Sequence, residues 1–180
     1  MLIFAKASLY RRILFYRFMK TKNDHPLDDI DIRILDAIQR DARLTIKELA
    51  DRIHLSASPT FERLKRLERE GFIKHYGAVV DHHKLGNDVI VLCNVRLKQH
   101  THDMITQFME RVQSIEQVTE CYNTTGDYDF LIKVFARDMQ DYQDFMLNTL
   151  GNIPCVGSLH SVIVIGEVKD SHVIPTRLNE

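Results

Sequence analysis

The chain has 180 residues and a mass of 21.0 kDa, and 44% of its residues are hydrophobic while 27% are charged. This length accommodates one domain or two small ones, and the composition excludes a disordered chain. The formal net charge of -1 weighs against nucleic acid as a partner, but the charge is unevenly distributed. Residues 1–26 carry +5, residues 27–80 are neutral and residues 81–180 carry -6. Such asymmetry indicates a basic binding part and an acidic remainder.

The first 26 residues are basic and apolar but do not form a secretion signal. Four cationic side chains interrupt the apolar residues, so there is neither a signal-peptide core nor an apolar run of the roughly 20 residues that span a membrane. One interpretation is an amphipathic helix. The favoured interpretation is that the true start is Met19, because the domain-like pattern begins at Leu27. Without a targeting signal, the expected location is the cytoplasm.

Residues 27–80 are predicted to form three helices and a short strand. Apolar residues recur with helical spacing between Ile30 and Ile38. Thr45 precedes Glu48 by three residues, which is the capping-box arrangement, and opens a second short helix.

The third helix is expected to begin at Ser58 and Pro59 and to end at Gly71. Its predicted apolar stripe consists of Phe61, Leu64 and Leu67. The strand-like residues 72–80 follow. Two short helices separated by a tight turn, with a strand after the second, predict a winged helix-turn-helix.

The third helix also carries the residue types that read DNA. Small hydroxyl residues at its start allow the backbone to approach phosphates, and arginine side chains reach base edges in the major groove. The alternative is a solvated helix whose charges pair with one another. The candidate DNA-binding residues are Ser56, Ser58, Pro59, Thr60, Glu62, Arg63, Lys65, Arg66 and, in the wing, Lys74.

A family resemblance rests on three stretches of this region. L-D-D-I-D-I-R-I-L-D at residues 27–36, T-I-K-E-L-A at 45–50 and S-A-S-P-T-F-E-R-L-K-R-L-E-R-E-G-F at 56–72 resemble the winged helix-turn-helix of the Lrp/AsnC (leucine-responsive regulatory protein, feast/famine) family. The similarity extends over about residues 27–170. It implies a sequence-specific transcriptional regulator that binds double-stranded DNA. It also implies that the residues matching Ser56, Ser58, Pro59, Thr60, Arg63 and Arg66 begin or line the recognition helix.

Residues 87–170 show the order strand, helix, strand, strand, helix, strand. Strands are expected at residues 89–97, 118–122, 130–136 and 162–165, and helices at 104–112 and 139–150. This order predicts a ferredoxin-like βαββαβ domain with an antiparallel sheet and both helices on one face, so the whole chain belongs to the α+β class. Residues 81–86 are expected to be a hinge and residues 171–180 a C-terminal tail.

The strands at residues 89–97 and 130–136 are apolar on both faces, so the sheet face without helices requires cover. A second copy of the chain is the simplest source, which predicts a homodimer. A dimer also supplies two recognition helices related by two-fold symmetry, as a palindromic site requires. The family resemblance implies further assembly into tetramers or octamers.

The loop between the two middle strands is a candidate small-molecule site. Two aspartates that bracket an aromatic residue can hold an amino group, and backbone N–H groups freed by a glycine turn can hold a carboxylate. The alternative is an ordinary hairpin turn. The resemblance implies that this loop lines an amino-acid effector pocket. The candidate effector-binding residues are Thr125, Gly126, Asp127, Tyr128 and Asp129.

Other functions have little support in the sequence. The three cysteines lack CxxC spacing, and neither His82-His83 nor His100-x-His102 has a further ligand at metal-binding spacing, so no metal site is predicted. No motif of an enzyme or of a nucleotide-binding loop is present, and no cofactor is expected. The remaining alternative to a DNA-binding regulator is a ligand-sensing or structural oligomer that does not bind DNA.

Overall fold

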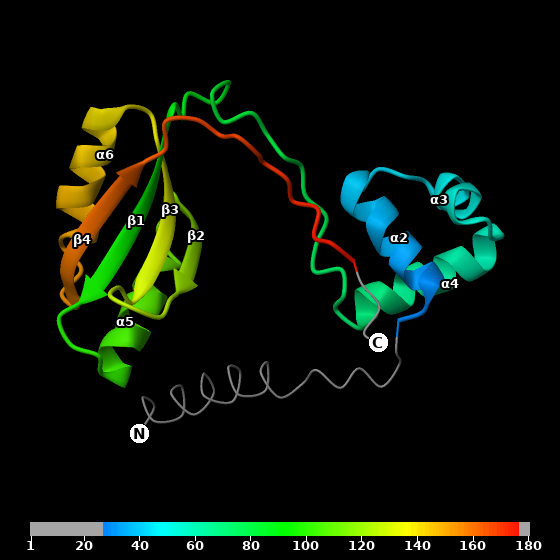
Figure 1. The fold of residues 1–180 in the computed structure, drawn as a ribbon, viewed down its shortest axis with the longest axis horizontal. Helices are drawn as coiled ribbons and strands as arrows, with labels where there is room; N and C mark the ends of the chain where they lie inside the picture. Colours follow the sequence, from blue (N-terminus) through cyan, green and yellow to red (C-terminus); the bar gives the residue numbers. More distant parts are fainter. Residues whose placement is uncertain (1–26, 177–180) are drawn as a thin grey trace. The chain divides into compact units, whose positions relative to one another are not determined.

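The computed structural model describes residues 27–176, which form two compact units (Figure 1). The proposed start at Met19 and the interpretation of residues 1–18 lie outside the described residues. One unit contains residues 27–77 together with 171–176, and the other contains residues 78–170. Among residues 27–176, no helix has the length and apolar character needed to cross a membrane.

The first unit is built from helices α2 (Asp29–Arg40), α3 (Ile46–Ile53) and α4 (Ala57–Arg69). Thr45 and Glu48 cap α3 reciprocally, which confirms the predicted capping box. Asp28 and Asp31 form a second capping box at the start of α2. The three helices enclose an apolar core of Ile34, Ile38, Leu49, Ile53, Leu64 and Leu67.

Helix α4 begins earlier than predicted and is rotated relative to the predicted stripe. Ser56 is the N-cap, so Ser58 is already helical. Thr60 is completely buried, whereas Phe61 is 43% exposed. Thr60 enters the core because its hydroxyl donates to the carbonyl oxygen of Ser56 at 2.9 Å, which satisfies the polar group locally. The prediction that Phe61 belongs to the apolar stripe is therefore wrong.

Residues 72–80, predicted as a wing strand, have no ladder partner within residues 27–176. Phe72 and Ile73 pack on the helices and the hydroxyl of Tyr76 donates to Glu68 of α4 at 2.8 Å, whereas Val79 and Val80 are exposed. At the other end of the chain, residues 171–176 join the helical unit through Gln39. Its side chain donates to the carbonyl oxygen of Ile174 at 3.3 Å and accepts from the same residue's backbone nitrogen at 2.8 Å.

The second unit is the predicted βαββαβ domain. Its elements are β1 (Val89–Leu97), α5 (His102–Val112), β2 (Val118–Asn123), β3 (Phe130–Ala136), α6 (Met139–Phe145) with the π-helical turn η1 (Met146–Leu150), and β4 (Val156–Ile163). The sheet is antiparallel with strand order β2-β3-β1-β4. Alternate residues of β1 and β3 form one core with α5 and α6, so both helices cover the same face of the sheet.

Strand β4 differs from the prediction, which placed it at residues 162–165. It begins at Val156 and ends at Ile163. Its position at the sheet edge explains the difference, because an edge strand pairs on one side only and tolerates polar residues such as Ser158 and His160. The apolar run at 162–165 therefore extends beyond the end of the strand.

A histidine at the start of this unit makes its stability depend on pH. His82 lies 2.6 Å from the carbonyl oxygen of Asn87 through Nδ1 and 3.3 Å from Glu167 through Nε2. The bond to Asn87 and the Glu167 carboxylate raise the pKa of His82 above its ordinary value, because both ring nitrogens have acceptors when the ring is charged. This stabilisation is complete below about pH 6.5 and is lost as pH rises through the higher folded-state pKa.

We therefore expect His82→Gln to lower the melting temperature more at pH 5.5 than at pH 8.5. Thermal unfolding of both proteins at the two pH values measures this difference. An equal loss at both values would contradict the assignment.

Candidate functional site

The exposed stripe of α4 consists of Ser58, Glu62, Lys65 and Arg69. These residues are spaced by four, three and four positions, so they share the helix face opposite the buried Thr60, Leu64 and Leu67. Lys65 donates to Glu68 at 2.7 Å and lies 5.8 Å from the ring centre of Phe61. We call these four residues the α4 stripe. Its net charge is positive and its side chains are polar, which suits a groove lined by phosphates and base edges.

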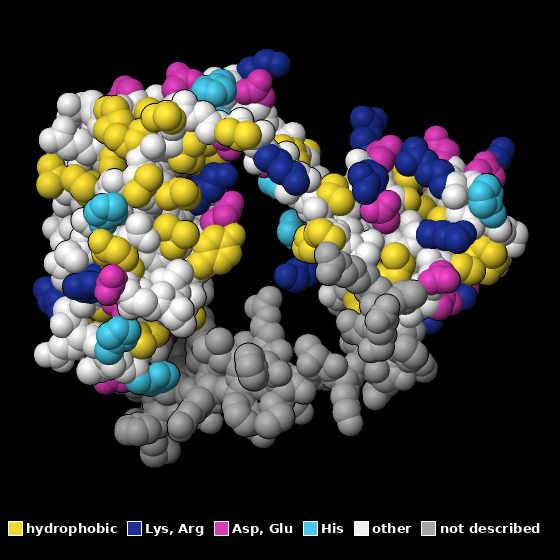
Figure 2. Space-filling model, in the orientation of Figure 1, with side chains coloured by type: hydrophobic (Ala, Val, Ile, Leu, Met, Phe, Trp, Pro, Cys, Tyr) yellow, Lys and Arg dark blue, Asp and Glu magenta, His cyan; other side chains and the backbone are white. Residues whose placement is uncertain are grey.

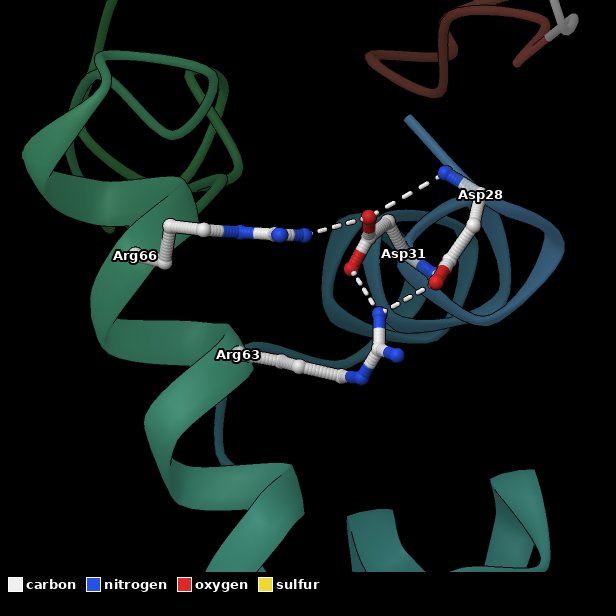
Figure 3. A network of polar contacts seen from close by, with 4 residues as sticks. All are labelled: Asp28, Asp31, Arg63 and Arg66. Atoms are coloured by element: carbon white, nitrogen blue, oxygen red, sulfur yellow. Dashed lines mark hydrogen bonds and ion pairs between the residues drawn. The ribbon is translucent and has the colours of Figure 1, made fainter. Parts of the chain in front are cut away.

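Two arginines predicted to contact DNA are instead bound to the start of α2 (Figure 3). Arg63 donates from one nitrogen to Asp28 at 2.6 Å and to Asp31 at 2.8 Å. Arg66 donates to the other carboxylate oxygen of Asp31. The side chain of Asp31 is only 1% exposed. In this structure Arg63 and Arg66 are therefore ion-pair partners of α2 and do not belong to the exposed face of α4.

The ionisation of this cluster favours the charged forms. Hydrogen bonds to Asp28 and then Asp31 raise the pKa of Arg63 above its ordinary value. Burial alone would raise the pKa of Asp28, but the backbone nitrogen of Asp31 and the Arg63 guanidinium together lower it. Asp28 and Arg63 are consequently both charged at neutral pH.

The remaining DNA-binding candidates have different positions. Ser56, Pro59 and Lys74 are exposed. Thr60 is buried, and its hydroxyl donates to the carbonyl oxygen of Ser56 in its own helix. Arg69 is exposed and has the spacing of a groove residue, so it joins the DNA-binding candidates. The i, i+4, i+7 repeat of Thr60, Leu64 and Leu67 is the signal that places Arg69 on the opposite face.

The surface of the helical unit mixes both signs of charge. In Figure 2, Lys and Arg side chains alternate with Asp and Glu over α2, α3 and α4 on the face shown. Residues 27–80 have no net charge because their basic and acidic side chains are equal in number. Recognition of DNA by this unit therefore depends on the positions of a few Lys and Arg side chains and not on a broad basic surface.

Asp129, predicted to bind an effector, also links two segments of the sheet unit. Its side chain is 2% exposed, and one carboxylate oxygen accepts from the backbone nitrogen of Leu97 at 2.7 Å. The other oxygen lies 2.6 Å from Nε2 of His100. Asp129 thus joins the loop before β3 to the end of β1.

The other loop residues lie at the surface. Thr125, Gly126 and Asp127 are exposed, and Gly126 has φ of +107°, a conformation that favours glycine. The carbonyl oxygen of Asp127 accepts from Nε of Arg96 at 2.7 Å, which leaves the Asp127 carboxylate at the rim of the loop.

Tyr128 lies between two residues that sequence reasoning missed. Its ring centre is 5.4 Å from the Arg96 guanidinium and 5.9 Å from the His160 ring centre. Arg96 is on β1 and His160 is on β4, and β1 pairs with β4, so the strand register brings both next to the loop. A cation, an anion and an aromatic ring therefore converge at this loop, as a zwitterionic ligand requires.

The face of the sheet opposite the helices carries a group of apolar side chains among polar ones. The register places Leu92 beside Val162 and Lys133, and Leu131 beside Tyr122 and Asn94. Tyr122 and Val162 are exposed. Figure 2 shows hydrophobic side chains at the surface of this unit. We call Leu92, Tyr122, Leu131 and Val162 the open sheet face.

Within residues 27–176, no group of three or more His, Cys, Asp or Glu side chains is arranged to hold a metal ion. Two histidines of the pairs considered for a metal have acidic partners. His83 bonds to Asp88 at 2.7 Å, and His100 pairs with Asp129.

Comparison with known proteins agrees with both units. The model of a winged helix-turn-helix DNA-binding domain matches residues 27–74, and that of the Lrp/AsnC ligand binding domain matches residues 90–174. The leucine-responsive regulatory proteins of Klebsiella pneumoniae and Escherichia coli are each 38% identical to this chain over 160 residues, which is 88% of this chain and 98% of theirs.

Solved structures show the same fold over most of the chain. A transcriptional regulator of Neisseria meningitidis, crystallised as an L-Met complex, superposes with a TM-score of 0.80 at 32% identity, covering 83% of this chain and 96% of the other. Escherichia coli AsnC superposes with a TM-score of 0.77 at 28% identity, covering 84% of this chain and all of the other.

Proposed function

The chain belongs to the Lrp/AsnC family and is a DNA-binding transcriptional regulator with a ligand-binding domain; from this premise we propose that the α4 stripe reads DNA and that the loop around Asp127 senses an amino acid. The observation that carries the first part is the phase of α4, which leaves Ser58, Glu62, Lys65 and Arg69 exposed. Ser58 at the helix start is placed for a phosphate. Lys65 and Arg69 supply cations for phosphate or for a guanine edge.

DNA binding is tested with a duplex selected from a random pool by the full chain, titrated over a range of salt concentrations. We expect Arg69→Ala to weaken binding to the selected duplex by about 1–3 kcal/mol if it contacts a base. We expect Lys65→Ala to reduce the salt dependence of binding by about one counterion per helix.

Glu116→Ala, an exposed position in the other unit, is the control and leaves both quantities unchanged. Selection that enriches no duplex would contradict DNA reading. Wild-type affinity and salt dependence in both variants would show that another face of the helical unit is used.

The effector proposal rests on the convergence of Arg96, Asp127 and Tyr128. The Arg96 guanidinium is placed for the carboxylate of an amino acid, and the Asp127 carboxylate for its amino group. The L-Met complex of the Neisseria relative supports an amino acid as the class of effector. Thr125 and Gly126 complete the rim of the site, and Asp129 anchors the loop through its bond to the backbone nitrogen of Leu97.

The open sheet face supports a homodimer formed sheet to sheet, which brings two α4 stripes to one DNA site. Assembly of dimers into a tetramer or octamer is part of the same proposal. A regulator of this kind acts in the cytoplasm and needs neither a catalytic residue nor a cofactor beyond its amino-acid effector.

A further inference from the structure

In the charge cluster between α2 and α4, two residues of α4 bind the carboxylate of Asp31 on α2. Arg63 and Arg66 lie one turn apart on α4, and each donates to a different oxygen of Asp31. The oxygen that receives Arg66 also accepts the backbone nitrogen of Asp28 at 3.1 Å, which ties the carboxylate to the start of α2. Figure 3 shows both arginines projecting from α4 toward this one point.

Two-point attachment constrains α4 in a way that its apolar contacts do not. Leu64 and Leu67 pack on the core, but apolar contacts have no direction and tolerate small rotations of a helix about its axis. Hydrogen bonds to two oxygens of a buried carboxylate are directional. They fix both the rotation of α4 and its position along α2. The α4 stripe lies on the same helix, so its orientation is fixed with it.

The arginines also have their charge compensated within the protein. Asp28 and Asp31 carry two negative charges against the two positive charges of Arg63 and Arg66, and the Asp31 side chain is buried. Arginines held in this way release few counterions when DNA binds. Lys65 also has an acidic partner, Glu68, but its side chain is 51% exposed.

We propose that Asp31 is a positioning residue for DNA reading: it clamps Arg63 and Arg66 and thereby sets the angle at which α4 presents its stripe to the groove. This inference rests on the proposed reading of DNA by α4. In this proposal Arg63 and Arg66 contribute to sequence specificity because they orient α4, and they do not contact the bases directly.

The test compares Asp31→Asn, Arg66→Lys and Lys65→Ala in the full chain, with circular dichroism to confirm folding. Each protein is titrated with the selected duplex and with a scrambled duplex of the same composition, over a range of salt concentrations. Arg66→Lys keeps the charge but shortens the side chain and removes the terminal nitrogen that donates to Asp31. The Arg66 side chain is 27% exposed, so this variant reports on geometry even if Asp31→Asn does not fold.

We expect Asp31→Asn and Arg66→Lys to reduce the preference for the selected duplex at least about tenfold, and Arg66→Lys to keep the salt dependence of the wild type. Lys65→Ala is expected to change the salt dependence instead. The double variant Asp31→Asn with Arg66→Lys is expected to lose little more of the preference for the selected duplex than either single variant, because both substitutions disrupt the same set of bonds.

An unchanged preference in folded Arg66→Lys would overturn the inference. So would tighter binding and a steeper salt dependence in Asp31→Asn, since that result would mean that Asp31 competes with DNA phosphates for the two arginines. Failure of the wild type to prefer any duplex would contradict the proposed function itself and is thus distinguishable from both.

Discussion

Asp129→Ala is expected to destabilise the sheet unit by about 2–3 kcal/mol, although its neighbour Asp127 tolerates the same change. Removal of the Asp129 carboxylate leaves the buried backbone nitrogen of Leu97 without its acceptor and His100 without its ion-pair partner. An unsatisfied buried donor costs about 1–3 kcal/mol, and a bond to a charged acceptor contributes at the upper end. Urea unfolding of the full chain, followed by the fluorescence of its tyrosines or by far-ultraviolet circular dichroism, measures the loss.

Asp127→Ala is the matched control, because it removes an exposed carboxylate from the same loop and keeps the carbonyl that accepts from Arg96. We expect its unfolding free energy to stay within about 0.5 kcal/mol of the wild type. Its amino-acid response is expected to disappear while DNA binding without amino acid is retained. If Asp127→Ala keeps its response to every amino acid tested, the effector site lies elsewhere. If Asp129→Ala is as stable as the wild type, its carboxylate is not the structural link described above.

The contrast between these two aspartates shows where sequence reasoning reached its limit. Both residues stand beside Tyr128 in a loop rich in turn residues, and composition predicts the same role for both. Which of them turns inward depends on the partner at the end of β1, and that partner is a backbone nitrogen with no sequence signature. Arg96 was missed for the same reason, because its approach to the loop follows from strand pairing.

Periodic patterns were predicted with much greater success. The three helices of the first unit, the capping box at Thr45 and the βαββαβ order follow from residue spacing alone, and the structure confirms them. The phase of α4 was predicted less well because Thr60 is polar and Phe61 is apolar, so hydropathy assigned their positions the wrong way round. The buried ion pairs of Asp31 were beyond sequence reasoning, since Arg63 and Arg66 have the residue type and position of a DNA-reading pair.

The open sheet face provides the prediction with the largest expected effect. Leu131 lies near the start of β3, between Tyr122 on one neighbouring strand and Asn94 on the other. In a sheet-to-sheet dimer its side chain meets the second copy. Leu131→Asp would then bury an unpaired carboxylate, which costs about 3 kcal/mol or more. We expect the dissociation constant of the dimer to rise at least about 100-fold, as measured by sedimentation over a series of concentrations.

Leu147→Asp is the control for this change, because Leu147 is exposed on η1, in the helical layer and not on the open sheet face. It introduces the same charge into the same unit and is expected to leave the dimer intact. A wild type that sediments as a monomer at micromolar concentration would contradict the dimer, and dissociation by both variants would point to a general loss of stability. If only Leu131→Asp dissociates the dimer, its DNA binding tests the next step. A larger loss of affinity for a palindromic duplex than for a duplex with one half-site, each compared with the wild type, would connect the open sheet face to the pairing of two α4 stripes on DNA.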